Sequence, residues 1–212
     1  LRTVPLEQEG DRWTLDMDAL RRAAGPETKL LLFGHPHNPV GKVFRRKELE
    51  ALADFCERQG LWVCSDEIHC DLMLDAGRHV PLASLGTGIA ARTVTLMAPS
   101  KTFNLSGLSC GYAVIPDPEI RERFRSATGE LVPHPNVFGY VACRAAYEKG
   151  EPWRLELIDY LRGNRDLLES YVAERLPMLS VSHVEATYLA WIDIRGLGEK
   201  IGAAFFEERG VR

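Results

Sequence analysis

Three polar stretches of the sequence each follow a short apolar run, and each contains a residue whose type could do chemistry. "GHPHNPVG" follows "KLLLF" and supplies Asn38, whereas "SDEIHCDL" follows "LWVC" and supplies Asp66 and His69. "APSKTFNLSGL" follows "TVTLM" and supplies Lys101. In an open α/β sheet, the ligand crevice lies beyond the carboxyl ends of the parallel strands. We therefore expect an amide, a carboxylate with an imidazole, and an amine to meet at one edge of a sheet.

Each of these residues is weak evidence when it is taken alone. An asparagine before a proline usually forms a turn, an aspartate after a strand usually caps a helix, and a lysine is usually solvated. Together they fit the needs of pyridoxal 5'-phosphate (PLP). A lysine that attacks an aldehyde must be a neutral amine, which burial favours, and a carboxylate beside the pyridine nitrogen keeps the ring electron-withdrawing. The candidates for these roles are Lys101 and Asp66, with Asn38 for the phenolic oxygen.

The three stretches, in this order and at this spacing, resemble fold-type-I PLP enzymes of the class-I/II aminotransferase superfamily. They are most similar to its cystathionine beta-lyase, or C-S lyase, branch, which "WTLDMDAL" and "EATYLAWIDIRGL" also resemble. The resemblance implies that Lys101 forms the Schiff base with PLP, that Asp66 contacts the pyridine nitrogen and that Asn38 contacts the phenolic oxygen. It also implies an amino acid as the substrate and a homodimer as the assembly.

The sequence departs from the ordinary aminotransferase pattern around the aspartate and the lysine. His69 stands where aminotransferases tend to carry a tyrosine, as it does in the lyase branch, and we expect it to contact the cofactor. Ala98 and Ser109 stand where aminotransferases tend to carry a serine and an arginine for the cofactor phosphate. The remaining candidates for the phosphate are Ser100, Thr102, Asn104 and backbone amides.

The resemblance implies a reaction that cleaves a carbon–sulfur bond. A cystathionine or a related cysteine S-conjugate would lose its thiol and leave pyruvate and ammonia, with Lys101 as the general base at the substrate Cα. A class-I/II aminotransferase is the alternative, and no residue type in the sequence decides between the two. A second alternative is a regulatory or binding protein with the PLP fold whose activity is incidental.

Composition excludes several other classes of protein. The 212 residues include 26 basic and 30 acidic side chains, which gives a net charge of −4 and no basic footprint for nucleic acid. No apolar run approaches the roughly 20 residues of a membrane span, so we expect a cytoplasmic protein without a membrane partner. The five cysteines are odd in number and form no CxxC pair, which argues against a disulfide framework or a thiolate zinc site.

The pattern of apolar residues predicts the elements that position these side chains. Alternating strands and helices indicate an α/β fold with a mostly parallel sheet flanked by helices, followed by part of a smaller α+β domain. We expect a PLP-binding domain over 1–149 and a bridging helix with the small domain over 150–212. The expected strands are 29–34, 61–67, 93–98, an antiparallel 111–116 and a β-like run over 187–194. The expected helices are 16–24, 46–60, 135–150, 153–176 and one that starts near 198.

The ends of the sequence and some of its histidines invite further interpretation. The chain begins at Leu1 and ends at "ERGVR", so we expect an internal piece that lacks the family's N-terminal phosphate loop and C-terminal substrate arginine. A metal cluster of His35, His37, His69 and Cys70 is an alternative that lacks a carboxylate-rich second shell. We expect His35, His37 and His134 in loops or on the rim, and Tyr188 and Trp191 in the small-domain core.

Overall fold

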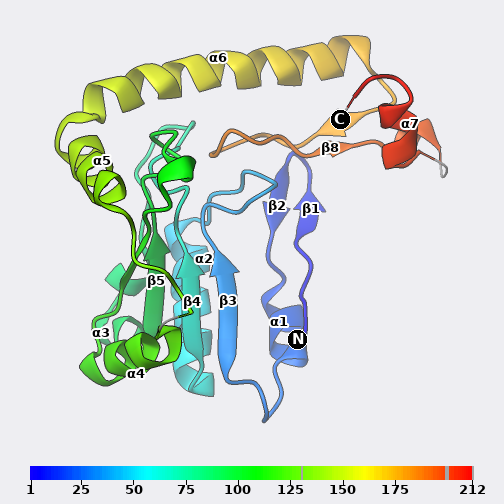
Figure 1. Cartoon of the computed structure of the whole chain (residues 1–212). Coiled ribbons are helices and arrows are strands. Elements are labelled where there is room, and N and C mark those ends of the chain that lie inside the picture. Colours follow the sequence, from blue (N-terminus) through cyan, green and yellow to red (C-terminus); the bar gives the residue numbers. More distant parts are fainter. Residues whose placement is uncertain (130, 199–200, 212) are drawn as a thin grey trace.

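The computed structural model describes residues 1–129, 131–198 and 201–211, and its centre is a four-stranded sheet (Figure 1). The strand order is β3 (Leu30–Gly34), β4 (Trp62–Asp66), β5 (Thr93–Met97) and β6 (Tyr112–Val114). The first three strands run parallel, and β6 runs antiparallel to β5. The predicted α/β class and the predicted antiparallel direction of the fourth strand are therefore both confirmed.

Helix α2 (Arg46–Gln59) supplies five of the twelve buried residues in the core cluster on one face of this sheet. Its buried residues recur at the helical spacing of three and four, and they pack with Phe33 and Val63 of the sheet. The Glu48 carboxylate accepts a hydrogen bond from the Arg45 backbone amide at 2.7 Å, which gives this amide a partner at the start of the helix. Gly60 ends the helix in the left-handed conformation at φ 64°.

The remaining helices and short strands connect or flank this core. The helices are α1 (Met17–Ala23), α3 (Thr87–Ala90), α4 (Pro118–Thr128), α5 (Val137–Lys149), α6 (Glu151–Arg175) and α7 (Ala203–Glu207). Two small antiparallel pairs are β1 (Glu7–Glu9) with β2 (Arg12–Thr14), and β7 (Ser180–Val181) with β8 (Ile192–Asp193). Of the helix expected from residue 198, Glu199 and Lys200 lie outside the described residues.

Helix α4 is absent from the sequence prediction, although the sequence carries its start signal. The Asp117 carboxylate caps the helix by accepting a hydrogen bond from the Ile120 backbone amide at 2.9 Å. Pro118 occupies the first turn, where its missing N–H costs nothing. No residue of α4 is buried, so the apolar periodicity that indicates most helices is weak there.

Two expectations about strands are wrong. The apolar run of residues 29–34 is typical of a strand that is buried on both faces of a parallel sheet, but Leu30 and Leu32 are 50% and 63% exposed, whereas Phe33 is buried. Alternate residues of a strand face opposite sides, and only the side of Phe33 packs against α2. The expected β-like run over 187–194 forms a strand only at Ile192–Asp193. Thr187, with φ 74°, interrupts the extended backbone at its start.

Helix α6 joins the sheet to the C-terminal part of the chain. It crosses the top of the view in Figure 1, from α5 toward β8. Arg154 and Arg162 of α6 donate hydrogen bonds to the carbonyl oxygens of Asp71 and Leu74, at 2.9 and 2.5 Å. A second apolar cluster of Leu72, Leu74, Ile158 and Val184 lies beneath these bonds. The loop that follows β4 is therefore held by α6. None of the described helices is long and apolar enough to cross a bilayer.

His183 connects three segments near the C-terminal end of α6. Its Nδ1 lies 3.0 Å from Glu169 Oε2, and its Nε2 lies 3.0 Å from Asp75 Oδ1. Arg165 forms a second ion pair with Asp75 at 2.7 Å and also contacts Asp166. Burial lowers the pKa of His183, but the hydrogen bonds and charges of Glu169 and Asp75 outweigh it and raise the pKa above its usual 6.5.

We predict that His183→Gln destabilises the protein more at acidic than at alkaline pH. A raised folded-state pKa means that the charge contribution is complete below about pH 6.5 and is lost as the pH rises through the folded-state value. We expect a loss of about 0.5–1 kcal/mol at pH 6, since the pair is partly solvated, and a smaller loss at pH 9. Urea denaturation of both proteins at both pH values measures this difference. An equal loss at pH 6 and pH 9 would contradict the charge contribution.

Candidate functional site

The register of the parallel strands brings the three polar stretches to one edge of the sheet. Gly34, at the end of β3, pairs with Asp66 of β4, which pairs in turn with Leu96 of β5. The next backbone amides continue this alignment: His35 N donates to Asp66 O at 2.9 Å, and Glu67 N donates to Leu96 O at 3.0 Å. The chain therefore leaves all three strands at the same level. Asp66 lies at the end of its strand, and Asn38 and Lys101 lie four residues after the ends of theirs.

His69 lies three residues after Asp66, in the loop that follows β4 at the same edge of the sheet. Burial lowers the pKa of His69, the charge of Lys101 lowers it further, and the charge of Asp66 partly opposes the change. His69 is 3% exposed, and its two ring nitrogens are buried without a hydrogen-bond partner among the described residues. The strand register therefore delivers the segments that carry Asp66, His69 and Lys101 to one edge of the sheet.

The Asp66 carboxylate and the Lys101 amine remain available for a ligand. Asp66 is exposed, and only its Oδ1 accepts a hydrogen bond, from the Ile68 amide at 3.3 Å. Lys101 is half-buried, and within the described ranges no salt bridge involves Lys101 or Asp66. An amine and a carboxylate at one rim, beside an imidazole with unused nitrogens, can bind a polar ring from several sides.

The backbone around Lys101 forms a tight turn. Phe103 N donates to Pro99 O at 2.9 Å, and Leu105 N donates to Ser100 O at 3.1 Å. Thr102 is buried and its hydroxyl has no partner among the described residues, whereas Asn104 is exposed with φ 54°. Ser100, Thr102 and Asn104 thus belong to the same turn as Lys101, and they remain candidates for an anionic group.

Asn38 is the exposed residue of a largely buried loop that the C-terminal part of the chain packs against. His37 N donates to Lys42 O and Gly41 N donates to His37 O, both at 2.9 Å, which closes the loop. Ala186 N donates to Gly41 O at 3.0 Å. A side chain on Gly41 would lie 2.9 Å from Ala186 O, so glycine is required at this contact as well as at its φ of 67°.

One of the histidines expected on the rim lies in the core instead. His35 is fully buried between the rings of Phe33, Phe44 and His79. Burial, followed by the charge of His79, lowers the pKa of His35 to about 3, so the imidazole is neutral. His35 does lie in the loop that follows β3, as expected, but its side chain packs into the core instead of facing the rim. Among residues 1–129, 131–198 and 201–211, no three His, Cys, Asp or Glu side chains are grouped to hold a metal ion.

The expectation that Tyr188 and Trp191 lie in the small-domain core is also wrong. They are 46% and 49% exposed, so they are not core residues. The Tyr188 ring meets the His69 ring edge-on, with centroids 5.7 Å apart. Trp191 instead lines two pockets near the β1–β2 hairpin. His134 lies in an exposed loop, as expected.

Sequence reasoning missed a buried carboxylate directly behind Asp66. Glu67 is fully buried, and its Oε1 accepts hydrogen bonds from Ser65 Oγ at 2.8 Å and Leu82 N at 3.2 Å. Its Oε2 lies 2.5 Å from His79 Nε2. The sequence signal for this contact is a second acidic residue at the end of a strand that is expected to be buried. Acidic residues are rarely fully buried unless they are paired, so a buried Glu67 implies a partner. Glu67 thereby anchors the backbone that carries Asp66.

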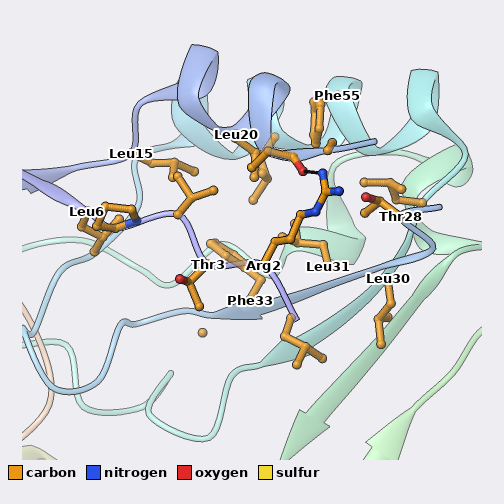
Figure 2. A pocket seen from close by; sticks show the side chains of 18 of the residues that line it. Arg2, Thr3, Leu6, Leu15, Leu20, Thr28, Leu30, Leu31, Phe33 and Phe55 are labelled. Carbon is orange, nitrogen blue, oxygen red and sulfur yellow. Dashed lines mark hydrogen bonds between the residues drawn. The ribbon is translucent and has the colours of Figure 1, made fainter. Parts of the chain in front are cut away.

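A large apolar cavity in the described chain is a different feature. It has a volume of about 870 Å³ and lies between the N-terminal segment, α1 and the open side of β3 (Figure 2). Apolar side chains such as Leu6, Leu20 and Phe33 line it, and Arg2 closes one side through a 2.8 Å hydrogen bond to Ala23 O. Asp66 and Lys101 do not line this cavity. It is therefore separate from the polar site at the strand ends.

Comparison with known proteins shows which family and which proteins this chain is similar to. The sequence profile described as "Aminotransferase class I and II" matches residues 1–211. Cystathionine beta-lyase PatB of Bacillus subtilis is 38% identical over 92% of this chain and 51% of its own length. The crystal structure of OvoB superposes with a TM-score of 0.94 at 50% identity, over 98% of this chain and 55% of that one. The chain spans about half the length of the curated relatives it matches.

A second solved structure carries a cofactor in its description. Cystalysin of Treponema denticola, which contains pyridoxal 5'-phosphate, is 33% identical with a TM-score of 0.89 and covers 96% of this chain and 52% of its own. The names of the curated relatives include both cystathionine beta-lyases and N-succinyldiaminopimelate aminotransferases. The predicted fold family is therefore confirmed, and both activities occur among the names of similar proteins.

We predict that Glu67→Ala strongly destabilises the protein. The substitution leaves the Ser65 hydroxyl, the Leu82 amide and the His79 ring without their buried partner. Each buried polar group that is left without its partner costs about 1–3 kcal/mol of unfolding free energy. Urea denaturation measures the loss, and Glu50→Ala on the exposed face of α2 is the control, with a change within about 0.5 kcal/mol. A similar change for the two variants would show that the Glu67 contacts do not stabilise the fold.

Proposed function

Because this chain belongs to the aminotransferase class I and II family, we propose that it is part of a PLP-dependent carbon–sulfur β-lyase. The observation that carries the proposal is the convergence of Asp66, His69 and Lys101 at the ends of parallel strands. The imidazole of His69 and the hydroxyl of Thr102 are buried there without a partner in the described part of the chain. Buried polar groups without partners are uncommon unless a ligand completes them. The residues at this edge therefore fit a polar, aromatic cofactor.

Each side chain has a separate task in this proposal. The Lys101 amine would hold PLP covalently, the Asp66 carboxylate would keep the proton on the pyridine nitrogen, and Asn38 would donate a hydrogen bond to the phenolic oxygen. His69 would face the ring, and the Ser100 to Asn104 turn would hold the phosphate. When it is bound, PLP accepts the electrons that are left on the substrate when a proton leaves its Cα.

Lys101 then removes the Cα proton from an amino acid whose Cβ carries sulfur. A general base must lie within hydrogen-bond reach of the proton it takes, and the amine that would hold the cofactor would be placed beside the substrate Cα. The Cβ–S bond breaks, and addition of water gives a thiol, pyruvate and ammonia. We propose cystathionine or a related cysteine S-conjugate as the substrate class, since PatB is named a cystathionine beta-lyase.

The proposed arrangement divides the chain at the joint between α5 and α6. Residues 1–149 would hold the cofactor, and residues 150–212 would bridge to a smaller domain. The whole protein would act as a homodimer in the cytoplasm, as the resemblance implies.

An aminotransferase is the second candidate. It is favoured by relatives that are named N-succinyldiaminopimelate aminotransferases and are 36% identical over 92% of this chain. The same four side chains would serve that reaction, because the two activities differ only in where Lys101 delivers the proton.

We predict that the full-length protein binds PLP through Lys101. The protein should absorb in the near-visible range, and borohydride should abolish the band and add the mass of reduced PLP at Lys101. Lys101→Ala should lose the band, whereas Lys29→Ala, on an exposed loop, should keep it. Asp66→Asn should bind PLP at least about tenfold more weakly, because the charge partner of the ring nitrogen is lost. Labelling at a different lysine would contradict the assignment of Lys101.

We predict that the full-length protein releases pyruvate and thiol from L-cystathionine. The measurement is pyruvate by a coupled assay and free thiol by a colorimetric reagent, with the Lys101→Ala variant as the control. If the protein binds PLP but instead converts it to the pyridoxamine form with an amino donor, the lyase proposal fails and the aminotransferase proposal stands.

A further inference from the structure

The segment 184–187 packs against two of the loops that form the site. Ala186 N donates to Gly41 O in the Asn38 loop at 3.0 Å, and Thr187 N donates to Leu72 O in the His69 loop at 2.8 Å. Leu74 N and Asp75 N both donate to Glu185 O, and Met73 pairs with Ala186 as an isolated β-bridge. This segment therefore borders the site together with the loops that follow β3, β4 and β5. It lies more than a hundred residues after the loops that follow β3 and β4 in the sequence.

The backbone of this wall is strained where it meets the site. Thr187 is fully buried and has φ 74°, a conformation that is rare for a β-branched residue. Its hydroxyl accepts a hydrogen bond from the Leu189 amide at 3.1 Å, which holds the turn together with the bond to Leu72. Strain of this kind persists where the surrounding contacts fix it, and such positions cluster at ligand sites.

The strained turn directs Tyr188 toward His69. The two rings meet edge-on at 5.7 Å, with an angle of 70° between their planes. Tyr188 nevertheless remains 46% exposed, so much of its ring is free for a further contact. His69 in turn belongs to the loop after β4, which leaves the sheet at the same level as the Lys101 turn after β5. The free part of the Tyr188 ring therefore lies at the edge of the sheet that also carries Lys101.

We propose that Tyr188 is a specificity residue that contacts the side chain of the amino-acid substrate, and that it favours a thioether there. The inference rests on the proposed function, because it requires an amino acid bound at Lys101. Sulfur makes favourable contacts with the edges of aromatic rings, and Tyr188 supplies a ring that its neighbours hold in place. An amino acid without such a side chain gains nothing from this contact.

The test compares two amino acids that cannot undergo β-elimination. L-Methionine carries a thioether, L-alanine carries only a methyl group, and binding of each to the PLP-loaded full-length protein is measured from the change in cofactor absorbance. We expect Tyr188→Ala to weaken L-methionine binding by about three- to tenfold and L-alanine binding by less than about twofold. Tyr188→Phe should retain the wild-type preference, because the ring rather than the hydroxyl makes the contact.

Trp191→Ala is the matched control. Trp191 is an aromatic residue close in sequence to Tyr188 with a similar exposed fraction, but it lines the pockets near the N-terminal hairpin and not the site. It should leave both affinities unchanged. Equal weakening of both amino acids by Tyr188→Ala, or loss of the preference in Tyr188→Phe, would overturn the inference. If the wild-type protein forms the PLP adduct but shifts with neither amino acid, the proposed function itself fails. Circular dichroism confirms that each variant is folded.

Discussion

The hydrogen-bonded register of three parallel strands is the constraint on which the candidate site depends. Gly34, Asp66 and Leu96 lie side by side, and the backbone bonds just beyond them keep the three chains aligned as they leave the sheet. A shift of one residue in either strand pair would turn every side chain of the shifted strand to the opposite face. The carboxylate of Asp66 would then lie on the opposite face of the sheet. The position of the candidate site residues at this edge thus depends on backbone pairing.

Buried polar contacts behind the rim reinforce this register. Glu67 follows Asp66 directly and binds His79 and the Leu82 backbone amide, which links the end of β4 to the chain that precedes β5. His35 stacks on His79 and is neutral, since burial lowers its pKa to about 3. The residue after each of two adjacent strand ends is therefore fixed in the core, while its neighbours stay open to a ligand. Rigid support of this kind holds functional side chains within narrow limits of position.

The C-terminal part of the chain closes the site through contacts between residues that are distant in sequence. Helix α6 binds the loop after β4 through Arg154 and Arg162. The segment 184–187 bonds to that loop and to Gly41, and the strained Thr187 turn presents Tyr188 to His69. Interactions that span both halves of the chain thereby determine which side chains face a substrate.

The sequence by itself determined the features whose causes are local. Asp16 predicts the start of α1, where its carboxylate accepts the Asp18 amide, and the apolar run of residues 93–97 predicts β5. The short link after β5 predicts that β6 returns antiparallel. The order of the three polar stretches after apolar runs predicted that the segments carrying Asp66 and Lys101 leave the sheet at one edge, because parallel strands share one carboxyl edge. The start signal of α4 at Asp117 was also present, although its weak periodicity hid it.

Only the tertiary structure decided which face each side chain meets. The exposure of Leu30, the burial of His35 and the pairing of Glu67 with His79 depend on what packs against the sheet from elsewhere in the chain. The position of Tyr188 depends on a backbone turn that is held by Leu72, more than a hundred residues earlier. Residue type and periodicity describe a strand and its neighbours along the chain. They carry no information about contacts that form only when distant segments are brought together.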